Sequence, residues 1–236
     1  MTEHYDVLAI GAHPDDIEAG IGGILIDLVK RRYRCAIAIL THGELGTGGT
    51  REIRAQEIKD GAALLGADVV ALFDWGDTKL EDHYDKRLEL AKVIRQVKPK
   101  VIITPYPHVG HGRYQSHPDH VAAGILTLNA ANLASLKKIE LSVDLHHTPK
   151  IMHYFLAPGV LPSCIVDITP HFKEWMAAVS AHRSQFLNPE KTRDFIEFIT
   201  SIARSWGLQG QCKYGQALYS PEPILIKNLM SLVDDQ

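Results

Sequence analysis

Short apolar segments alternate with amphipathic segments along the first half of the chain, and this alternation constrains the fold more than any other feature. Each apolar segment is only a few residues long, as expected for strands buried on both faces. The segments between them repeat apolar residues at helical spacing. Strands are therefore expected at 7–10, 35–40, 69–73 and 101–104, with helices at about 22–32, 51–65 and 84–97. Such alternation predicts βαβ units and a mostly parallel sheet.

The second half of the chain is less regular. A helix is expected from Pro118 to about Leu133, because proline is favoured in a first helical turn. Beyond it the pattern predicts strands near 151–156, near 165–168 and around Ile224, and helices at about 172–183 and 192–206. The expected fold class is thus α/β: a Rossmann-like, mostly parallel sheet with helices on both faces, in a single domain with an elaborated C-terminal part.

Composition excludes several classes of protein. The chain has 25 Lys and Arg against 28 Asp and Glu, so its net charge of -3 provides no basic field for nucleic acid. The three cysteines, Cys35, Cys164 and Cys212, form no C-x-x-C pair, which argues against a disulfide framework or a thiolate zinc site. The apolar run at 7–10 is too short for a signal peptide or a membrane span. A cytoplasmic protein with no nucleic-acid or membrane partner is expected.

Polar side chains collect where the expected strands end. In open α/β sheets, ligands bind at the carboxyl ends of the strands, so this is where a functional site is expected. The residues that follow the four strands in turn are His13, Asp15 and Asp16; Thr41, His42 and Glu44; Asp74 and Asp77; and His117, Asp119 and His120.

Two tetrapeptides at these ends, His-Pro-Asp-Asp at 13–16 and His-Pro-Asp-His at 117–120, offer the ligands of a catalytic metal site. Hydrolytic zinc takes three nitrogen or oxygen ligands and leaves one position for a water, whose pKa falls to about 7. Two histidines and one carboxylate satisfy that need. A second carboxylate can then accept a proton from the attacking water, and a further histidine can stabilise or protonate what leaves. Either tetrapeptide alone would be explained by turn formation or helix capping, but the pair favours a metal site.

Other motifs carry less weight. His42-Gly43-Glu44 matches the H-x-E of zinc nucleobase deaminases, but the chain lacks their P-C-x-x-C partner. The glycine runs at 20–23 and 43–49 do not complete a dinucleotide-binding or phosphate-binding motif. We expect both runs to permit close backbone packing.

The sequence resembles the PIG-L/LmbE-type zinc-dependent N-deacetylases. The resemblance rests on Ala12–Glu18 followed by glycines at 20, 22 and 23, on Gly43-Glu44-Leu45-Gly46 leading to Arg51, Arg54 and Glu57, and on His117–His120. It covers about residues 5–186, which implies one domain over 1–236 with a C-terminal elaboration at about 187–236. Bacterial members of this family include the deacetylases of mycothiol and bacillithiol biosynthesis, which act on N-acetylglucosamine conjugates.

The resemblance also implies a role for each residue of the two tetrapeptides. Asp15 becomes the general base. His117 becomes the group that stabilises the oxyanion or protonates the leaving amine, and Asp119 the residue that orients it by hydrogen bonding. The zinc ligands implied are His13, Asp16 and His120.

The resemblance assigns the substrate contacts less completely than it assigns the roles of the two tetrapeptides. Arg54 matches an arginine that holds sugar hydroxyls, and Asp77 matches an acidic substrate contact, although the sequence around it departs from the common pattern. The bacillithiol branch carries an arginine directly before the second tetrapeptide, where this chain has Ser116, and this argues against a malate-bearing substrate. Arg113 and Tyr114 lie close by in the sequence and are candidate substrate contacts.

The resulting prediction is a zinc-dependent hydrolase, with Fe²⁺ as the alternative metal. It would remove the N-acetyl group from an N-acetylglucosamine-type conjugate and release acetate and a free amine. Two alternatives stay open: a metal-dependent hydrolase of a non-sugar N-acyl amide, and a non-catalytic metal- or sugar-binding protein. The spare carboxylate of Asp15 argues against the second. The expected partners are a small N-acetylated amino sugar and, in a homo-oligomer, further copies of the chain.

Overall fold

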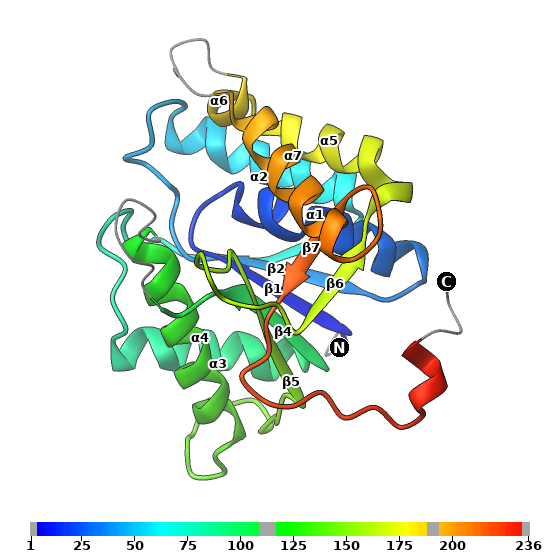
Figure 1. The fold of residues 1–236 in the computed structure, drawn as a ribbon. Coiled ribbons are helices and arrows are strands. Elements are labelled where there is room, and N and C mark those ends of the chain that lie inside the picture. The colour runs from blue at the N-terminus through cyan, green and yellow to red at the C-terminus, as the bar shows by residue number, and fades with distance from the viewer. Residues whose placement is uncertain (1–3, 109–116, 188–193, 233–236) are drawn as a thin grey trace.

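A five-stranded parallel sheet forms the centre of the protein (Figure 1). The structure is a computed structural model that describes residues 4–108, 117–187 and 194–232. The strand order is β3-β2-β1-β4-β5, and every neighbouring pair in this sheet is parallel. The strands are β1 (Val7–Gly11), β2 (Cys35–Ile39), β3 (Asp68–Leu72), β4 (Val101–Pro105) and β5 (Lys150–Tyr154). Along the chain, β2 and β3 are added on one side of β1, and β4 and β5 are then added on the other side. The direction in which strands are added therefore reverses between β1 and β4. That reversal is the place where α/β sheets open a ligand-binding crevice.

Helices cover both faces of the sheet, which confirms the expected fold class. All five residues of β1 are buried. Val7 and Ala9 point into one apolar cluster and Leu8 and Ile10 into another, as the alternation of side chains along a strand requires. The first cluster includes residues of α1 (Asp16–Lys30), α2 (Arg51–Leu65) and α5 (Phe172–Ala181), and the second includes residues of α3 (Tyr84–Val97) and α4 (Pro118–Ser135).

The C-terminal part adds a second, two-stranded sheet. Its strands, β6 (Cys164–Asp167) and β7 (Gly215–Leu218), are antiparallel, and an isolated bridge between His153 and Tyr219 links them to the edge of the main sheet. The remaining elements are η2 (Thr169–His171), α6 (Arg183–Phe186), α7 (Phe195–Gln209) and η3 (Leu229–Leu232).

The prediction of a strand around Ile224 is wrong. Ile224 is 43% exposed and lies in an irregular segment just after Pro221 and Pro223. The last strand among the described residues is β7 instead. Its sequence, Gly-Gln-Ala-Leu, carries little strand signal. It forms because pairing with β6 satisfies its backbone and because all four residues are buried.

The first helix begins at Asp16, six residues before the apolar repeat that predicted it. Three glycines in its first turns hide the helical pattern, and each is required by a neighbour packed against the helix. A Cβ at Gly20 would collide with the ring of Tyr154, one at Gly22 would lie 2.9 Å from Trp175, and one at Gly23 would lie 2.8 Å from Ile168. The expected close packing at this glycine run is therefore confirmed.

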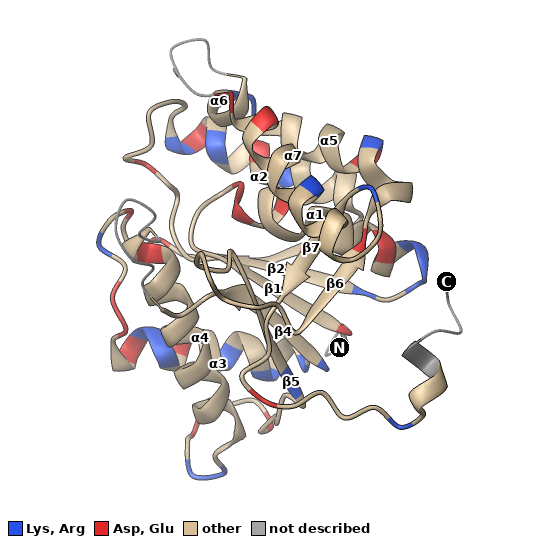
Figure 2. Cartoon of the chain, viewed as in Figure 1, with Lys and Arg blue, Asp and Glu red and all other residues tan. Residues whose placement is uncertain are grey.

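Charged residues lie mainly on the outer helices and loops, where Lys and Arg alternate with Asp and Glu (Figure 2). This mixture matches the net charge of -3. Within the described ranges, none of the helices is long and apolar enough to cross a bilayer.

Candidate metal and catalytic site

The two tetrapeptides meet at the reversal of strand order because β1 and β4 are neighbours. Each tetrapeptide leads into a helix: Asp16 is the first residue of α1, and His117 is the N-cap of α4 with Pro118 at its first position. The partial positive charge of a helix N-terminus favours a carboxylate there, which suits Asp16 and Asp119 in the first turns. Residues about a hundred positions apart in the sequence thus form one cluster.

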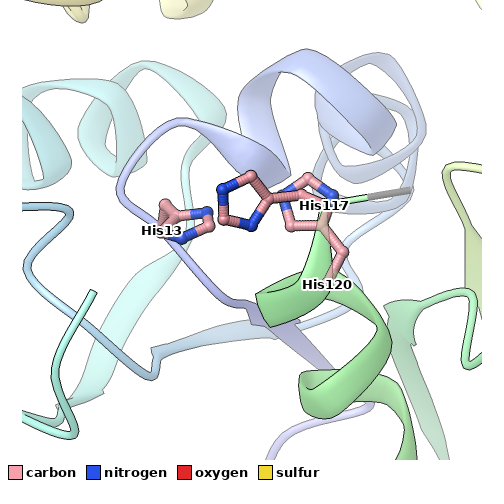
Figure 3. A group of neighbouring side chains, drawn as sticks. All are labelled: His13, His117 and His120. Atoms are coloured by element: carbon pink, nitrogen blue, oxygen red, sulfur yellow. The ribbon is translucent and has the colours of Figure 1, made fainter. Parts of the chain in front are cut away.

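Three histidine rings gather at the centre of this cluster (Figure 3). The ring of His13 lies 4.7 Å from that of His117 and 5.3 Å from that of His120, and the last two rings are 5.3 Å apart. Each ring offers a nitrogen to one group whose atoms all lie within 4.8 Å of one another, close enough to share a metal ion.

Asp16 lies between two of these rings. Its Oδ1 is 3.0 Å from His120 Nε2, and its Oδ2 is 3.6 Å from His13 Nδ1 and accepts a hydrogen bond from the backbone N–H of His13. Burial acts to raise the pKa of Asp16, but the neighbouring His120 and His13 outweigh it and hold that pKa well below its usual range. The structure therefore brings together all three predicted zinc ligands, with Asp16 as a carboxylate.

The other edge of the His13 ring faces two more carboxylates. His13 Nε2 lies 3.0 Å from Asp119 Oδ2 and 3.2 Å from Asp77 Oδ1. Burial by itself lowers the pKa of His13, but hydrogen bonds with Asp119, Asp16 and Asp77 outweigh burial and raise that pKa to about 12. The bond with His13 also lowers the pKa of Asp77 to about 2. Such an acidic setting attracts a cation.

The donors of the cluster, imidazole nitrogens and carboxylate oxygens, suit a divalent cation. His13, Asp77 and Asp119 form a second group whose ligand atoms lie within 4.8 Å, and it shares His13 with the three-histidine group. Asp119 Oδ1 is buried and has no hydrogen-bond partner among the described residues. Zinc prefers imidazole nitrogen and carboxylate oxygen, and a divalent cation here would compete with the proton on His13.

The Asp119 carboxylate faces His13, whereas the resemblance implied that Asp119 orients His117. Its carboxylate accepts hydrogen bonds from His13 Nε2 and from the backbone N–H of Thr78 at 2.7 Å, so it supports His13. The ring of His117 is held instead by the backbone, because the N–H of Asp119 donates to His117 Nδ1 at 3.2 Å. His117 as a whole is exposed, but part of its ring is buried. This partial burial and the nearby His13 and His120 lower the pKa of His117.

Asp15 precedes the predicted ligand Asp16 in the chain, and its carboxylate faces Arg54. Its side chain is 18% exposed, and its Oδ2 is 3.4 Å from Nη2 of Arg54. Burial raises the pKa of Asp15 to about 6, even though the nearby Arg54 acts in the opposite direction.

Two of the predicted substrate contacts, Arg54 and Asp77, are buried close to the cluster. Arg54 is 3% exposed and Asp77 is 5% exposed, and both bond to protein groups. Arg54 donates to backbone carbonyls, while Asp77 contacts His13 and accepts from the backbone N–H of Leu45 at 2.8 Å. Arg113 and Tyr114 lie outside the described residues.

Two neighbours of the cluster had no clear signal in the sequence. Phe155 has a φ of 55°, which is unusual for a bulky residue, and its ring stacks on that of His120 at 5.1 Å. His182 is fully buried, with Nε2 3.2 Å from Glu18 Oε1 in the first turns of α1. The resemblance extends to Ser184-Gln185-Phe186, close to His182 in the sequence, but it does not indicate the contact between His182 and Glu18.

A parallel sheet with a histidine and carboxylate cluster at its switch point defines an α/β protein with a candidate catalytic metal centre. A family model described as GlcNAc-PI de-N-acetylase (PIG-L) matches residues 8–131, just over half of the chain. The chain belongs to this family, as the sequence motifs indicated.

Similar proteins agree with this assignment. The diacetylchitobiose deacetylase of Thermococcus kodakarensis is 30% identical over 225 residues, which cover 90% of this chain and 81% of that protein. The crystal structure of the conserved protein TT1542 from Thermus thermophilus has a TM-score of 0.84 and 33% identity, with 94% of this chain and 97% of that one covered. A hydratase, the 4-carboxy-2-hydroxymuconate hydratase of Pseudomonas putida KT2440, shares the fold at a TM-score of 0.80 and 22% identity, covering 96% and 99% of the two chains. The fold therefore does not decide the reaction by itself.

Proposed function

We propose that this protein is a zinc-dependent N-deacetylase that converts an N-acetylglucosamine-type conjugate to acetate and a free amine. The observation that carries the proposal is the cluster of His13, Asp16 and His120 together with Asp15, a further carboxylate that precedes Asp16 in the chain and interacts electrostatically with Asp16 and His13. A site that only bound a metal would have no need of that carboxylate. The T. kodakarensis relative, named for diacetylchitobiose, makes a second sugar the first aglycone to test.

His13, Asp16 and His120 would hold the metal. A metal held there would supply Lewis acidity for the acetyl carbonyl and would lower the pKa of the attacking water. Asp119 and Asp77, on the far edge of the His13 ring, would fix the orientation of that ring. Fe²⁺ is the alternative metal, because nitrogen and carboxylate donors suit it as well.

Two further side chains would move or stabilise charge. Asp15, with a pKa of about 6, is mostly ionised at neutral pH and accepts the proton of the attacking water. His117 Nδ1 accepts the N–H of Asp119, so the neutral ring carries its proton on Nε2 and can donate it to the developing oxyanion. As the C–N bond breaks, the proton on Asp15 passes to the amine nitrogen, which leaves acetate and the free amine.

The decisive experiment is a metal analysis coupled to an assay of primary-amine release. The substrates are N-acetylglucosaminides that carry inositol, malate, phospholipid or a second sugar, together with N-acetylated amines that carry no sugar. We expect zinc-dependent release from at least one glucosaminide. Release only from the non-sugar amides would favour the alternative hydrolase. Bound zinc with no release from any of them would favour a binding protein, or a reaction like that of the hydratase that shares the fold.

We also propose that copies of the chain assemble through the C-terminal segment. Support comes from five apolar side chains that are exposed after β7, in a stretch too apolar to suit contact with water alone. They are Ile224, Leu225, Ile226, Leu229 and Met230. Light scattering on the full chain and on a chain ending at Ser220 tests this, and a monomer in both cases contradicts it. The three free thiols are consistent with a reducing cytoplasm as the place of action.

A further inference from the structure

An apolar cavity of about 570 Å³ lies outside the cluster of histidines and carboxylates. It is formed by α1, α5, α7, β7 and the loop after β5, and the helices and β7 pack together on one side of the main sheet (Figure 1). Small-molecule sites have volumes of about 300–1,000 Å³, so the cavity has the size of a binding site. In the part of the chain that the structure describes, none of the predicted metal ligands or substrate contacts lines it.

The walls of this cavity are aromatic and aliphatic. Trp175 of α5 and Trp206 of α7 line it, together with Phe198 and Ile202 of α7. Phe198 is 40% exposed and Ile202 is 42% exposed, so water reaches this apolar wall. Moving an apolar molecule from water to such a wall is favourable, because apolar surface on both sides is removed from water.

One buried polar group interrupts the apolar lining. Gln216 of β7 is 4% exposed, and its Oε1 accepts a hydrogen bond from the backbone N–H of Ile24 at 3.0 Å. The other end of the amide, Nε2, is buried and has no hydrogen-bond partner among the described residues. Buried polar groups in folded proteins are nearly always paired, so a donor left unpaired at the wall of a cavity calls for an acceptor from a ligand.

We propose that this cavity is a second binding site, which takes a small apolar molecule with one carbonyl group. The apolar part would pack against Trp175, Trp206 and Ile202, and the carbonyl oxygen would accept a hydrogen bond from Gln216 Nε2. Phe155 also lines the cavity, and its ring stacks on that of His120, so the bound molecule would lie next to the metal cluster without using its donors. Such binding would not depend on the proposed deacetylation.

Tryptophan fluorescence reports this binding directly, because two of the three tryptophans line the cavity. The probe is methyl octanoate, an apolar chain with one ester carbonyl, titrated into the full chain below its solubility limit. We expect a saturable change in emission that Trp75→Phe retains and Trp206→Phe weakens. Saturating N-acetylglucosamine should not displace the probe. Displacement by the sugar would place the ester at the metal cluster and overturn the proposal.

Ile202→Glu and Leu208→Glu form a matched pair for the apolar wall. Both residues are exposed on α7, but only Ile202 lines the cavity. A carboxylate beside the bound chain would lose its water, so Ile202→Glu should raise the Kd of methyl octanoate about tenfold or more, whereas Leu208→Glu should leave it unchanged. An equal Kd in the two variants would mean that the ester binds elsewhere.

Gln216→Met tests the donor, because methionine has nearly the same length but cannot donate to a carbonyl. The Kd should rise about 3- to 10-fold, which is the effect of one hydrogen bond. An unchanged Kd would contradict the role of Gln216. If Tm shows that Gln216→Met does not fold, the pair at 202 and 208 still decides.

The absence of a saturable change in the wild-type chain would refute the site. Light scattering on the same variants then identifies what covers this face instead. If Ile202→Glu converts an oligomer to a monomer and Leu208→Glu does not, a second copy of the chain occupies the cavity and the proposal fails.

Discussion

Replacing Asp15 with asparagine is the sharpest test of the proposed chemistry. The change removes the negative charge and the ability to accept a proton, but it keeps the size of the side chain and an oxygen that can face Arg54 Nη2, 3.4 Å away. Asparagine also tolerates a positive φ better than most residues. The nitrogen and oxygen atoms of His13, Asp16 and His120 are untouched, so zinc binding should be retained.

The expected changes in stability and in kcat follow from the interactions that Asp15→Asn leaves in place. Arg54 keeps its bond to the Pro14 carbonyl, so the free energy of unfolding should fall by only about 1 kcal/mol. General base catalysis contributes about 10²- to 10⁴-fold, so kcat should fall by that factor, or about 3 to 5 kcal/mol of activation free energy.

The assay measures amine release under saturating substrate, together with zinc content and thermal unfolding. Asp144→Asn is the matched control, because Asp144 is an exposed carboxylate in the connection between α4 and β5 that pairs with Lys98. The control should keep kcat. Turnover at the wild-type rate in Asp15→Asn, or loss of its zinc, would show that Asp15 is not the base.

Three further predictions follow from the contacts. His13→Ala should lose both zinc and turnover, as measured by metal analysis and amine release; zinc at the wild-type level would contradict the ligand assignment. Gly23→Ala should lower the free energy of unfolding by about 1–3 kcal/mol in urea titrations, because its Cβ would lie 2.8 Å from Ile168, and it should leave zinc content unchanged. Burial lowers the pKa of His153, which is 1% exposed, so the neutral form is favoured in the folded chain and protonation favours unfolding. Stability due to this group should be present above about pH 6.5 and be lost as the pH falls below it, and His153→Gln should weaken that dependence; an identical pH dependence in the variant would refute the reasoning.

Most of the sheet and its helices could be read from the sequence because each is specified locally. Buried strands such as Cys35–Ile39 are continuous apolar runs, and the helices over 51–65 and 84–97 have their predicted bounds. Where the local pattern is weak, prediction failed. Gly215–Leu218 is a strand only because β6 pairs with it, and the first turns of α1 contain glycines that only the packed neighbours explain.

The sequence by itself determined that the two tetrapeptides could share a site, because both follow strands of a parallel sheet. The resemblance to the family then implied which ligands they supply, His13, Asp16 and His120. Only the tertiary structure decided what each side chain faces. It turned Asp119 toward His13, and it buried Arg54 behind Asp15. The physical reason is that a motif specifies residue types and spacing, whereas a hydrogen bond depends on which strands are adjacent and which side chains are buried between them.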